Sequence, residues 1–212
     1  MICVLLGLTF QPAKANTINY TLGIGNSAIS GYTGPYGTVA VNLTDTTHAT
    51  ITFTALTGSG VDFLFAAHGA AAVNVNAASW TLSNIVGVNT YAGFTPGAYS
   101  DGGGAQEDGF GHFNQTIDSF DGYTHSATSL SFLLTDTSGA WASAADVLAV
   151  NNDGYVVAAH IFVTTDPAMT ERDALATGYA GNDPPSVPDG GATAPLLGMA
   201  VCGLAMMRRF LK

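Results

Sequence analysis

Residues 39–55 read VAVNLTDTTHATITFTA. Apolar and polar residues alternate on both sides of a polar centre, residues 44–47. The apolar positions are Val39, Val41 and Leu43 before that centre and Ile51, Phe53 and Ala55 after it. Alternation with a period of two, rich in Val, Ile and Thr, is typical of half-buried strands. The stretch therefore predicts a β-hairpin with one face in a hydrophobic core.

The same alternation extends in both directions from this hairpin. It predicts short strands at residues 18–24, 62–67, 71–75, 80–86, 113–117 and 130–134, and the apolar run 155–163 predicts a central strand. Asn151-Asn152-Asp153-Gly154 predicts a hairpin turn. Residues 100–111 predict a glycine-rich loop, 141–148 a helical turn and 168–177 a short helix. Many short strands separated by turns predict an all-β fold, and we expect a β-sandwich of jelly-roll kind.

Composition limits the classes of function. Apolar residues make up 47% of the chain and charged residues only 9%, which favours a folded core over disorder. The net charge is −10, and Arg172 is the only Lys or Arg between residues 16 and 186. Such a surface repels phosphates, so we exclude nucleic acid as a partner. It also disfavours lying on anionic lipid.

The N-terminal residues 1–15 predict a signal peptide. An apolar run, residues 2–10, precedes Ala13-Lys14-Ala15, which has the small-x-small cleavage pattern and makes Asn16 the first mature residue. No Lys or Arg precedes the apolar run, which a start codon further upstream would explain. The alternative is an N-terminal strand of the folded domain.

The last stretch of the chain combines three features. The segment Val187-Pro188-Asp189-Gly190-Gly191 precedes an uncharged apolar run, residues 192–207, and Arg208, Arg209 and Lys212 follow. A helix that is apolar on every side suits a membrane span. At 1.5 Å per residue it covers roughly 24 Å, and snorkelling cations make up the difference to a bilayer core. The cations place the preceding chain outside the cytoplasm.

This arrangement resembles the PEP-CTERM family of bacterial exosortase substrates. Here Pro188-Asp189-Gly190 replaces the usual Pro-Glu-Pro, which looks like the Val-Pro-Asp-Ser-Gly variant. The resemblance covers only the last tenth of the chain. It implies export, cleavage of the tail by a membrane-embedded exosortase-like protease-transpeptidase, and delivery to the cell surface or extracellular matrix. Gly190-Gly191 before a helix and an Arg pair also resembles the tails cut by rhomboid-type proteases, and a permanent membrane anchor is a further alternative.

These segments divide the chain. We expect a signal peptide at 1–15, a β-sandwich domain at 16–178, a linker at 179–186 and a sorting signal at 187–212. Cys3 and Cys202 both fall in the terminal segments, so the predicted domain has no disulfide, thiolate nucleophile or cysteine-bound zinc. Residues 108–182 also resemble the body of many tail-sorted proteins, a resemblance that implies no activity.

Two acidic segments are candidate sites. Asp101, Glu107 and Asp108 in the predicted loop 100–111 are candidate Ca²⁺ ligands, although their spacing does not match an EF-hand and a solvated loop is the simpler interpretation. Asp118 and Asp121 resemble the carboxylate pair of a glycosidase, but aspartates at that spacing more often cap a turn. We predict no cofactor and no metal, and a protein that is not an enzyme.

Histidines and aromatic residues supply the other candidates. His48, His68, His112, His125 and His160 contain no i, i+4 pair, although His112 and His125 are candidates to meet across a hairpin. Tyr32, Tyr36, Tyr91, Phe94 and Tyr99 lie among Gly and Pro and are candidates to stack on sugar rings or to cover the core. The sequence therefore favours a non-enzymatic surface or matrix protein, with a carbohydrate-binding or polysaccharide-acting module as the alternative. Exopolysaccharide is the corresponding possible partner.

Overall fold

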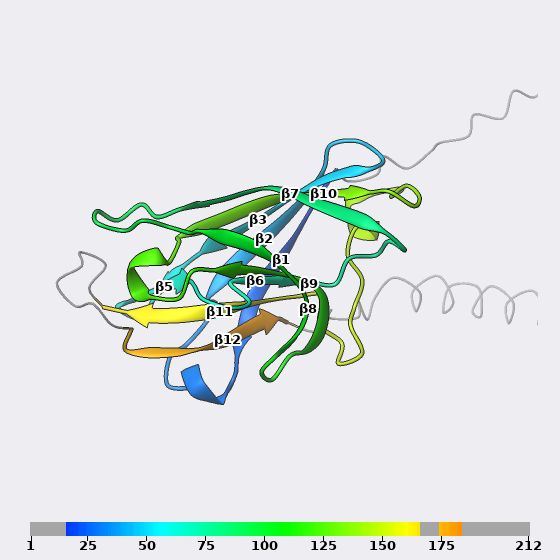
Figure 1. Cartoon of the computed structure of the whole chain (residues 1–212). Coiled ribbons are helices and arrows are strands. Elements are labelled where there is room, and N and C mark those ends of the chain that lie inside the picture. Colours follow the sequence, from blue (N-terminus) through cyan, green and yellow to red (C-terminus); the bar gives the residue numbers. More distant parts are fainter. Residues whose placement is uncertain (1–15, 166–173, 184–212) are drawn as a thin grey trace, which may run out of the picture.

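The computed structural model describes residues 16–165 and 174–183, and these residues form an all-β fold (Figure 1). The all-β prediction is confirmed. The strands are β1 (Thr17–Gly25), β2 (Gly37–Leu43), β3 (His48–Ala55), β4 (Thr57–Gly58), β5 (Val61–Phe65), β6 (Ala71–Val73), β7 (Trp80–Val88), β8 (Tyr99–Glu107), β9 (Gly111–Ser119), β10 (Ser129–Asp136), β11 (Val157–Thr164) and β12 (Ala176–Asn182). Three single-turn 3-10 helices accompany them: η1 (Ser27–Ile29), η2 (Tyr123–His125) and η3 (Ala144–Asp146).

One continuous antiparallel sheet joins all the described strands. Its order is β7-β10-β3-β2-β1-β12-β11-β6-β9-β8, and β5 pairs with β11 and β4. The sheet curls so that its two halves face each other, as the two layers of Figure 1 show. We expected two layers, but as the separate sheets of a jelly roll. Hydrogen bonds between β1 and β12 instead connect the layers, as when Leu22 pairs with Asn182.

The core lies between the two layers and follows the predicted alternation. Ala49, Ile51 and Phe53 of β3 are fully buried, and the polar residues between them are partly exposed. Leu130, Phe132 and Leu134 of β10 continue the same face. Phe53 stacks on Phe132 and meets Phe65 edge to face, so aromatic side chains from three strands fill the centre.

Side chains close the gap between the edge strands β7 and β8. At one end of β7, Trp80 Nε1 donates to Gln115 Oε1 at 2.9 Å. At the other end, the Tyr99 ring of β8 packs directly over Gly87, and a Cβ on Gly87 would overlap its hydroxyl. Trp80, Leu82 and Ile85 of β7 pack against the core but are only partly buried.

Strand β11 is central, as predicted. It pairs with β12 on one edge and with β5 and β6 on the other. Seven of its eight residues are buried because both faces are covered. One face contributes Val157, Ala159, Ile161 and Val163 to the core, and on the other Ala158 and Phe162 enter two smaller apolar clusters.

Strand β8 corrects the predicted loop at residues 100–111. Glycines weaken a strand in isolation, but β8 pairs with the strongly alternating β9 along its length. Register shifts on either side of Gly103 absorb the extra residues, and Gly103 has a φ of 63°, which favours glycine. Tertiary pairing therefore overrides the local preference.

Strand β12 corrects the predicted boundary of the domain. It runs to Asn182, four residues into the expected linker 179–186. The Asn182 side chain is buried and accepts from Val156 N at 2.8 Å and Val157 N at 3.0 Å. After Asp183 the sequence continues with Pro184 and Pro185, which have no N–H for a further step of a ladder.

The predicted hairpin between β2 and β3 is confirmed, whereas residues 151–154 form a turn but no hairpin, because β11 pairs with β12, β5 and β6 and not with the segment before the turn. Asp45 Oδ1 accepts from Thr47 N at 2.8 Å and His48 N at 2.9 Å between β2 and β3. Asn151 organises the turn before β11 by accepting from Asp153 N and Tyr155 N. The helical turn predicted at residues 141–148 is η3.

Several predicted segments lie outside the described residues. These are the signal peptide at 1–15, the sorting signal at 187–212 and most of the predicted helix at 168–177, whose last two residues belong to β12. Among the described residues, none of the helices has the length and apolar character needed to cross a bilayer.

Candidate functional site

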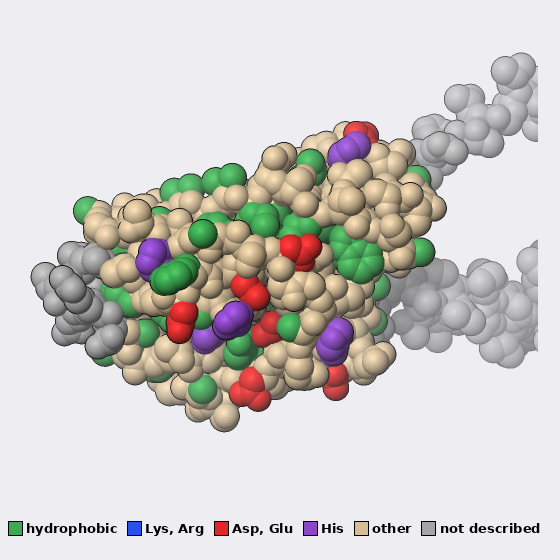
Figure 2. Space-filling view, viewed as in Figure 1, with side chains coloured by type: hydrophobic (Ala, Val, Ile, Leu, Met, Phe, Trp, Pro, Cys, Tyr) green, Lys and Arg blue, Asp and Glu red, His purple; other side chains and the backbone are tan. Residues whose placement is uncertain are grey.

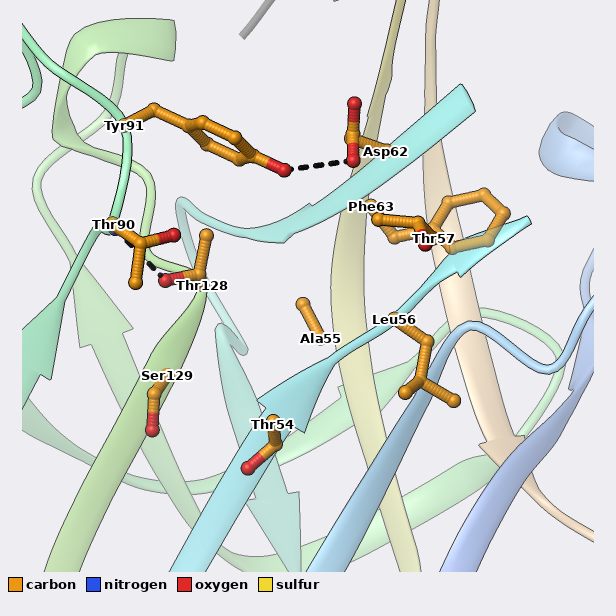
Figure 3. A pocket seen from close by; sticks show the side chains of 10 residues that line it. All are labelled: Thr54, Ala55, Leu56, Thr57, Asp62, Phe63, Thr90, Tyr91, Thr128 and Ser129. Carbon is orange, nitrogen blue, oxygen red and sulfur yellow. Dashed lines mark hydrogen bonds between the residues drawn. The ribbon is translucent and has the colours of Figure 1, made fainter. Parts of the chain in front are cut away.

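A groove of about 230 Å³ lies where β3 ends and β4 and β5 begin. Its lining consists of Thr54, Ala55, Leu56, Thr57, Asp62, Phe63, Thr90, Tyr91, Thr128 and Ser129 (Figure 3). Four of these residues are threonines, and the one charged group is the Asp62 carboxylate. The groove therefore offers hydroxyls and a carboxylate beside apolar side chains.

Tyr91 and Asp62 face each other across this groove. Tyr91 Oη donates to Asp62 Oδ1 at 2.8 Å, as the dashed line in Figure 3 shows. Burial, together with the Asp62 carboxylate, raises the pKa of Tyr91 to about 12. Tyr91 is thus held as a neutral phenol whose ring forms one wall of the groove.

The threonines of the groove differ in whether their hydroxyls already form hydrogen bonds within the protein. Thr128 Oγ1 donates to Val88 O and accepts from Thr90 N, both at 3.1 Å, so it mainly supports the loop that carries Tyr91. Thr54, Thr57 and Thr90 have exposed side chains. These three hydroxyls and Asp62 can exchange hydrogen bonds with a ligand.

The groove and the C-terminal exit lie at opposite ends of β11. Asp62 pairs with Thr164 at one end, whereas Asn182 bonds to Val157 at the other. Figure 1 shows β5 and the end of β12 correspondingly far apart. The groove is therefore remote from Asp183, the last described residue.

A second cluster combines acids, histidines and a tyrosine around Gly69. Asp118 Oδ1 accepts from Gly69 N at 2.9 Å, and Asp118 Oδ2 lies 3.1 Å from His68 Nδ1. Glu107 packs so closely against Gly69 that a Cβ there would overlap its carboxylate. Figure 2 shows several acidic and histidine side chains exposed on the visible face of the molecule.

The buried members of this cluster have shifted pKa values. Desolvation by burial is the main cause that raises the pKa of Glu107 to about 7, although a hydrogen bond from Tyr179 opposes it. Burial lowers the pKa of His160, whose ring stacks on Tyr179 with centroids 4.6 Å apart. Glu107 is 2% exposed, so it can exchange a proton near neutral pH but cannot contact a large ligand.

The structure separates the predicted Ca²⁺ ligands. Asp101 accepts from Gly103 N and Gln115 Nε2, Glu107 bonds to Tyr179, and Asp108 accepts from Asn26 Nδ2 at 2.9 Å. Residues 16–165 and 174–183 contain no group of three His, Cys, Asp or Glu side chains that could hold a metal ion.

The predicted carboxylate pair Asp118 and Asp121 is also rearranged. Asp118 bonds to Gly69 and lies beside His68, and its charge contributes to the raised pKa of Glu107. Asp121 lies in the turn after β9. Burial of Glu107 and its position on β8 are tertiary features, which explains why sequence spacing missed this pair.

The five histidines occupy four separate places. His48 contacts Asp45 at 2.9 Å, His125 Nδ1 lies 2.9 Å from Thr95 O, and His112 pairs with Gln106 between β8 and β9. His112 and His125 therefore do not meet across a hairpin. His68 and His160 do come together, because His160 N donates to Gly69 O beside His68.

One of the five candidate aromatic residues lines the groove, namely Tyr91. Tyr36 is buried against Phe63, Tyr99 covers Gly87 and Phe94 packs on Tyr123, so these three serve the core. Tyr32 packs partly against the core. The Asp62 partner of Tyr91 was missed, since the two residues lie 29 positions apart and no local pattern joins them.

Comparison with known proteins identifies the tail. Residues 186–210 match the family model of the VPDSG-CTERM motif, a variant of the PEP-CTERM sorting signal, with Gly190 at the position of the serine. The predicted sorting signal is therefore confirmed. It supports processing by an exosortase-type partner and indicates export to the cell surface. No curated protein and no solved structure matches the chain.

Proposed function

We propose that this chain is an exported, non-enzymatic surface or matrix protein whose β-sheet domain is delivered by cleavage at its C-terminal sorting signal. The match of residues 186–210 to the VPDSG-CTERM motif carries the proposal. The apolar residues 192–207 and the cations Arg208, Arg209 and Lys212 supply the membrane helix and its cytoplasmic flank. The signal peptide cleaved after Ala15 begins the same route.

The motif is suited to a protease groove rather than to simple anchoring. Pro188 disfavours helix at Val187 and removes a backbone donor. Gly190 and Gly191 have no side chains that would hinder the approach of another backbone. A permanent anchor would need only the apolar helix and its flanking charge.

Replacing Pro188 and Asp189 by alanine in the full-length chain tests this proposal. In cells that contain the processing enzyme, the wild type should lose Arg208, Arg209 and Lys212, whereas the variant should remain in the membrane with Lys212. Mass spectrometry of the C-terminal peptides reads this out. Retention of Lys212 in both proteins would establish a plain membrane anchor instead.

A second candidate function is binding of a neutral carbohydrate in the groove of Figure 3, favoured by Tyr91 and Asp62. Sugars offer hydroxyls to carboxylates and threonines and apolar faces to aromatic rings. No Lys or Arg occurs in the described residues, so an anionic glycan would find no cation there. Exopolysaccharide made of neutral sugars is therefore the ligand class that the groove suits.

Affinity electrophoresis through neutral polysaccharides tests this second function. Asp62→Ala and Tyr91→Phe should each abolish the retardation shown by the wild type, because each removes one partner of the 2.8 Å bond in the groove. Phe120→Ala, at an aromatic residue that is 60% exposed outside the groove, is the matched control. Equal retardation of the groove variants and the control would rule the groove out.

A further inference from the structure

The sorting motif begins very close to the folded sheet. Asp183 N donates to Thr21 O, which fixes Asp183 beside β1, and three residues, Pro184 to Ser186, separate Asp183 from Val187. Four extended residues reach at most about 14 Å. Val187 therefore stays within that distance of the folded domain.

Strand β1 continues over the same distance. It runs four residues beyond Thr21 in the direction of the leaving chain, to Thr17, which corresponds to about 13 Å. Val187 can therefore lie no further from Asp183 than about the length of the N-terminal half of β1, so an enzyme that binds the motif works close to this half of the strand.

The leaving chain also cannot gain length easily by unravelling β12. This strand lies inside the sheet between β1 and β11. Its last residue, Asn182, is 2% exposed and satisfies the buried backbone N–H groups of Val156 and Val157. Detaching it would leave both groups without partners.

We infer that the processing enzyme cleaves this chain with the folded β-sheet domain held against it, and that the exit surface is the part of the domain that the enzyme contacts. The exit surface consists of the exposed side chains Thr17, Asn19 and Thr21 of β1. The inference rests on the sorting function proposed above.

Charge favours the enzyme over lipid as the partner of the exit surface. The described part of the chain has acidic residues but no Lys or Arg, so anionic headgroups would repel it. Thr17, Asn19 and Thr21 are uncharged hydrogen-bonding side chains, which suit a polar protein surface. A polar extracytoplasmic face of the membrane-embedded enzyme is the matching partner.

Site-directed labelling of the full-length precursor tests the inference. Cys3 and Cys202 are the only cysteines, so Cys3→Ala and Cys202→Ala give a background free of thiols. Asn19→Cys places one thiol on the exit surface, and Ala92→Cys places one on the exposed loop beside the groove as the matched control. Each precursor is blocked with a bulky polyethylene glycol maleimide and incubated with membranes that contain the processing enzyme.

The label at position 19 should slow release of the C-terminal fragment by about tenfold or more, because it prevents the domain from seating beside the motif. The label at position 92 should leave the rate unchanged. A twelve-residue Gly-Ser insertion between Ser186 and Val187 adds roughly 19 Å of reach and should restore cleavage of the precursor labelled at position 19.

The outcomes separate the two proposals. Equal rates for the two labelled precursors, with normal cleavage of the unlabelled chain, would overturn the exit-surface contact alone. Slow cleavage at position 19 that the insertion fails to restore would also overturn it. Absence of cleavage in the unlabelled wild type would overturn the sorting function itself and this inference with it.

Discussion

Individual residues of this domain are held mainly by hydrogen bonds and packing between neutral groups. The residues that the structure describes contain no Lys or Arg, so their carboxylates bond to backbone N–H groups, amides, hydroxyls and histidines. Asp45 is an example, because the backbone N–H of Thr47 and the ring of His48 lower its pKa to about 2. The pKa of Glu107 is instead raised, because burial outweighs its hydrogen bond from Tyr179 and Asp118 adds a like charge.

Glu107 should make the protein less stable as pH rises. Its pKa is raised from 4.5 to about 7 in the folded state, so the folded state binds the proton more tightly. Its stabilising contribution is complete below about pH 4.5 and is lost as pH passes 7. Glu107→Gln should remove this dependence and stabilise the protein at pH 8 relative to wild type by about 2 kcal/mol.

Urea unfolding at pH 4.5 and pH 8 measures the Glu107 effect. The informative quantity is the difference between wild type and Glu107→Gln at each pH. Asp146→Asn, at an exposed carboxylate, is the control for loss of one negative charge. An equal difference at both pH values would show that Glu107 is not protonated in the folded protein near neutrality.

Gly87 should be intolerant of alanine. A Cβ at this position would overlap Tyr99 Oη, so the ring that closes the gap between β7 and β8 would have to move. We expect Gly87→Ala to destabilise the protein by about 1–3 kcal/mol, the usual effect of overpacking. In a Tyr99→Ala background the same substitution should cost much less, and thermal unfolding of the four proteins gives the coupling.

At the scale of elements, pairing between strands determines the secondary structure more than the local preferences of the residues do. The glycine-rich β8 forms because β9 offers a complete ladder, and β12 forms because β1 and β11 flank it. Specific residues end the strands. Two prolines follow Asp183 after β12, and the hydrogen bonds of Asp45 form the turn between β2 and β3.

Among the polar residues of β12, Asn182 should contribute most to the stability of the folded domain. Asn182→Ala removes the acceptor of two buried backbone N–H groups, and each unsatisfied group costs about 1–3 kcal/mol. We expect a loss of about 2–4 kcal/mol in the free energy of unfolding, measured in urea. Asn42→Ala, on an exposed site of β2, removes only a surface bond to Thr17 and should change the stability little.

At the scale of the whole molecule, the domain depends on its apolar core without covalent support. Its described residues contain no cysteine, and the core extends through all the long strands of the curled sheet. The groove and the chain exit occupy opposite ends of β11. A domain tethered through its C-terminus would therefore present the groove away from its attachment.

The mature protein should unfold identically with and without reductant. Residues 16–186 contain no cysteine, so no disulfide can contribute to their stability. Thermal unfolding followed by far-ultraviolet circular dichroism should give the same midpoint in both conditions, with a β-type spectrum. A lower midpoint of thermal unfolding in reductant would contradict this prediction, because it would require a disulfide that stabilises the domain.

The sequence by itself determined the all-β class, the hairpin between β2 and β3, the alternating core positions and the sorting motif. Each of these depends on neighbours in the chain. Period-two alternation decides which side chains face inward, and Asp45 forms its turn with residues two and three positions away. The motif at residues 186–210 is likewise a linear signal.

Only the tertiary structure decided the joining of the layers through β1 and β12, the strand at β8 and the pairing of Tyr91 with Asp62. It also brought Glu107 to Asp118 and His68. These features join residues far apart in sequence, and their energies come from burial and from hydrogen bonds that form only when the sheet curls. A local pattern carries no information about such partners. The same glycine-rich segment is a loop when it is solvated and a strand when a neighbouring strand pairs with it, and the same glutamate has an ordinary pKa in water and a raised pKa when the fold buries it.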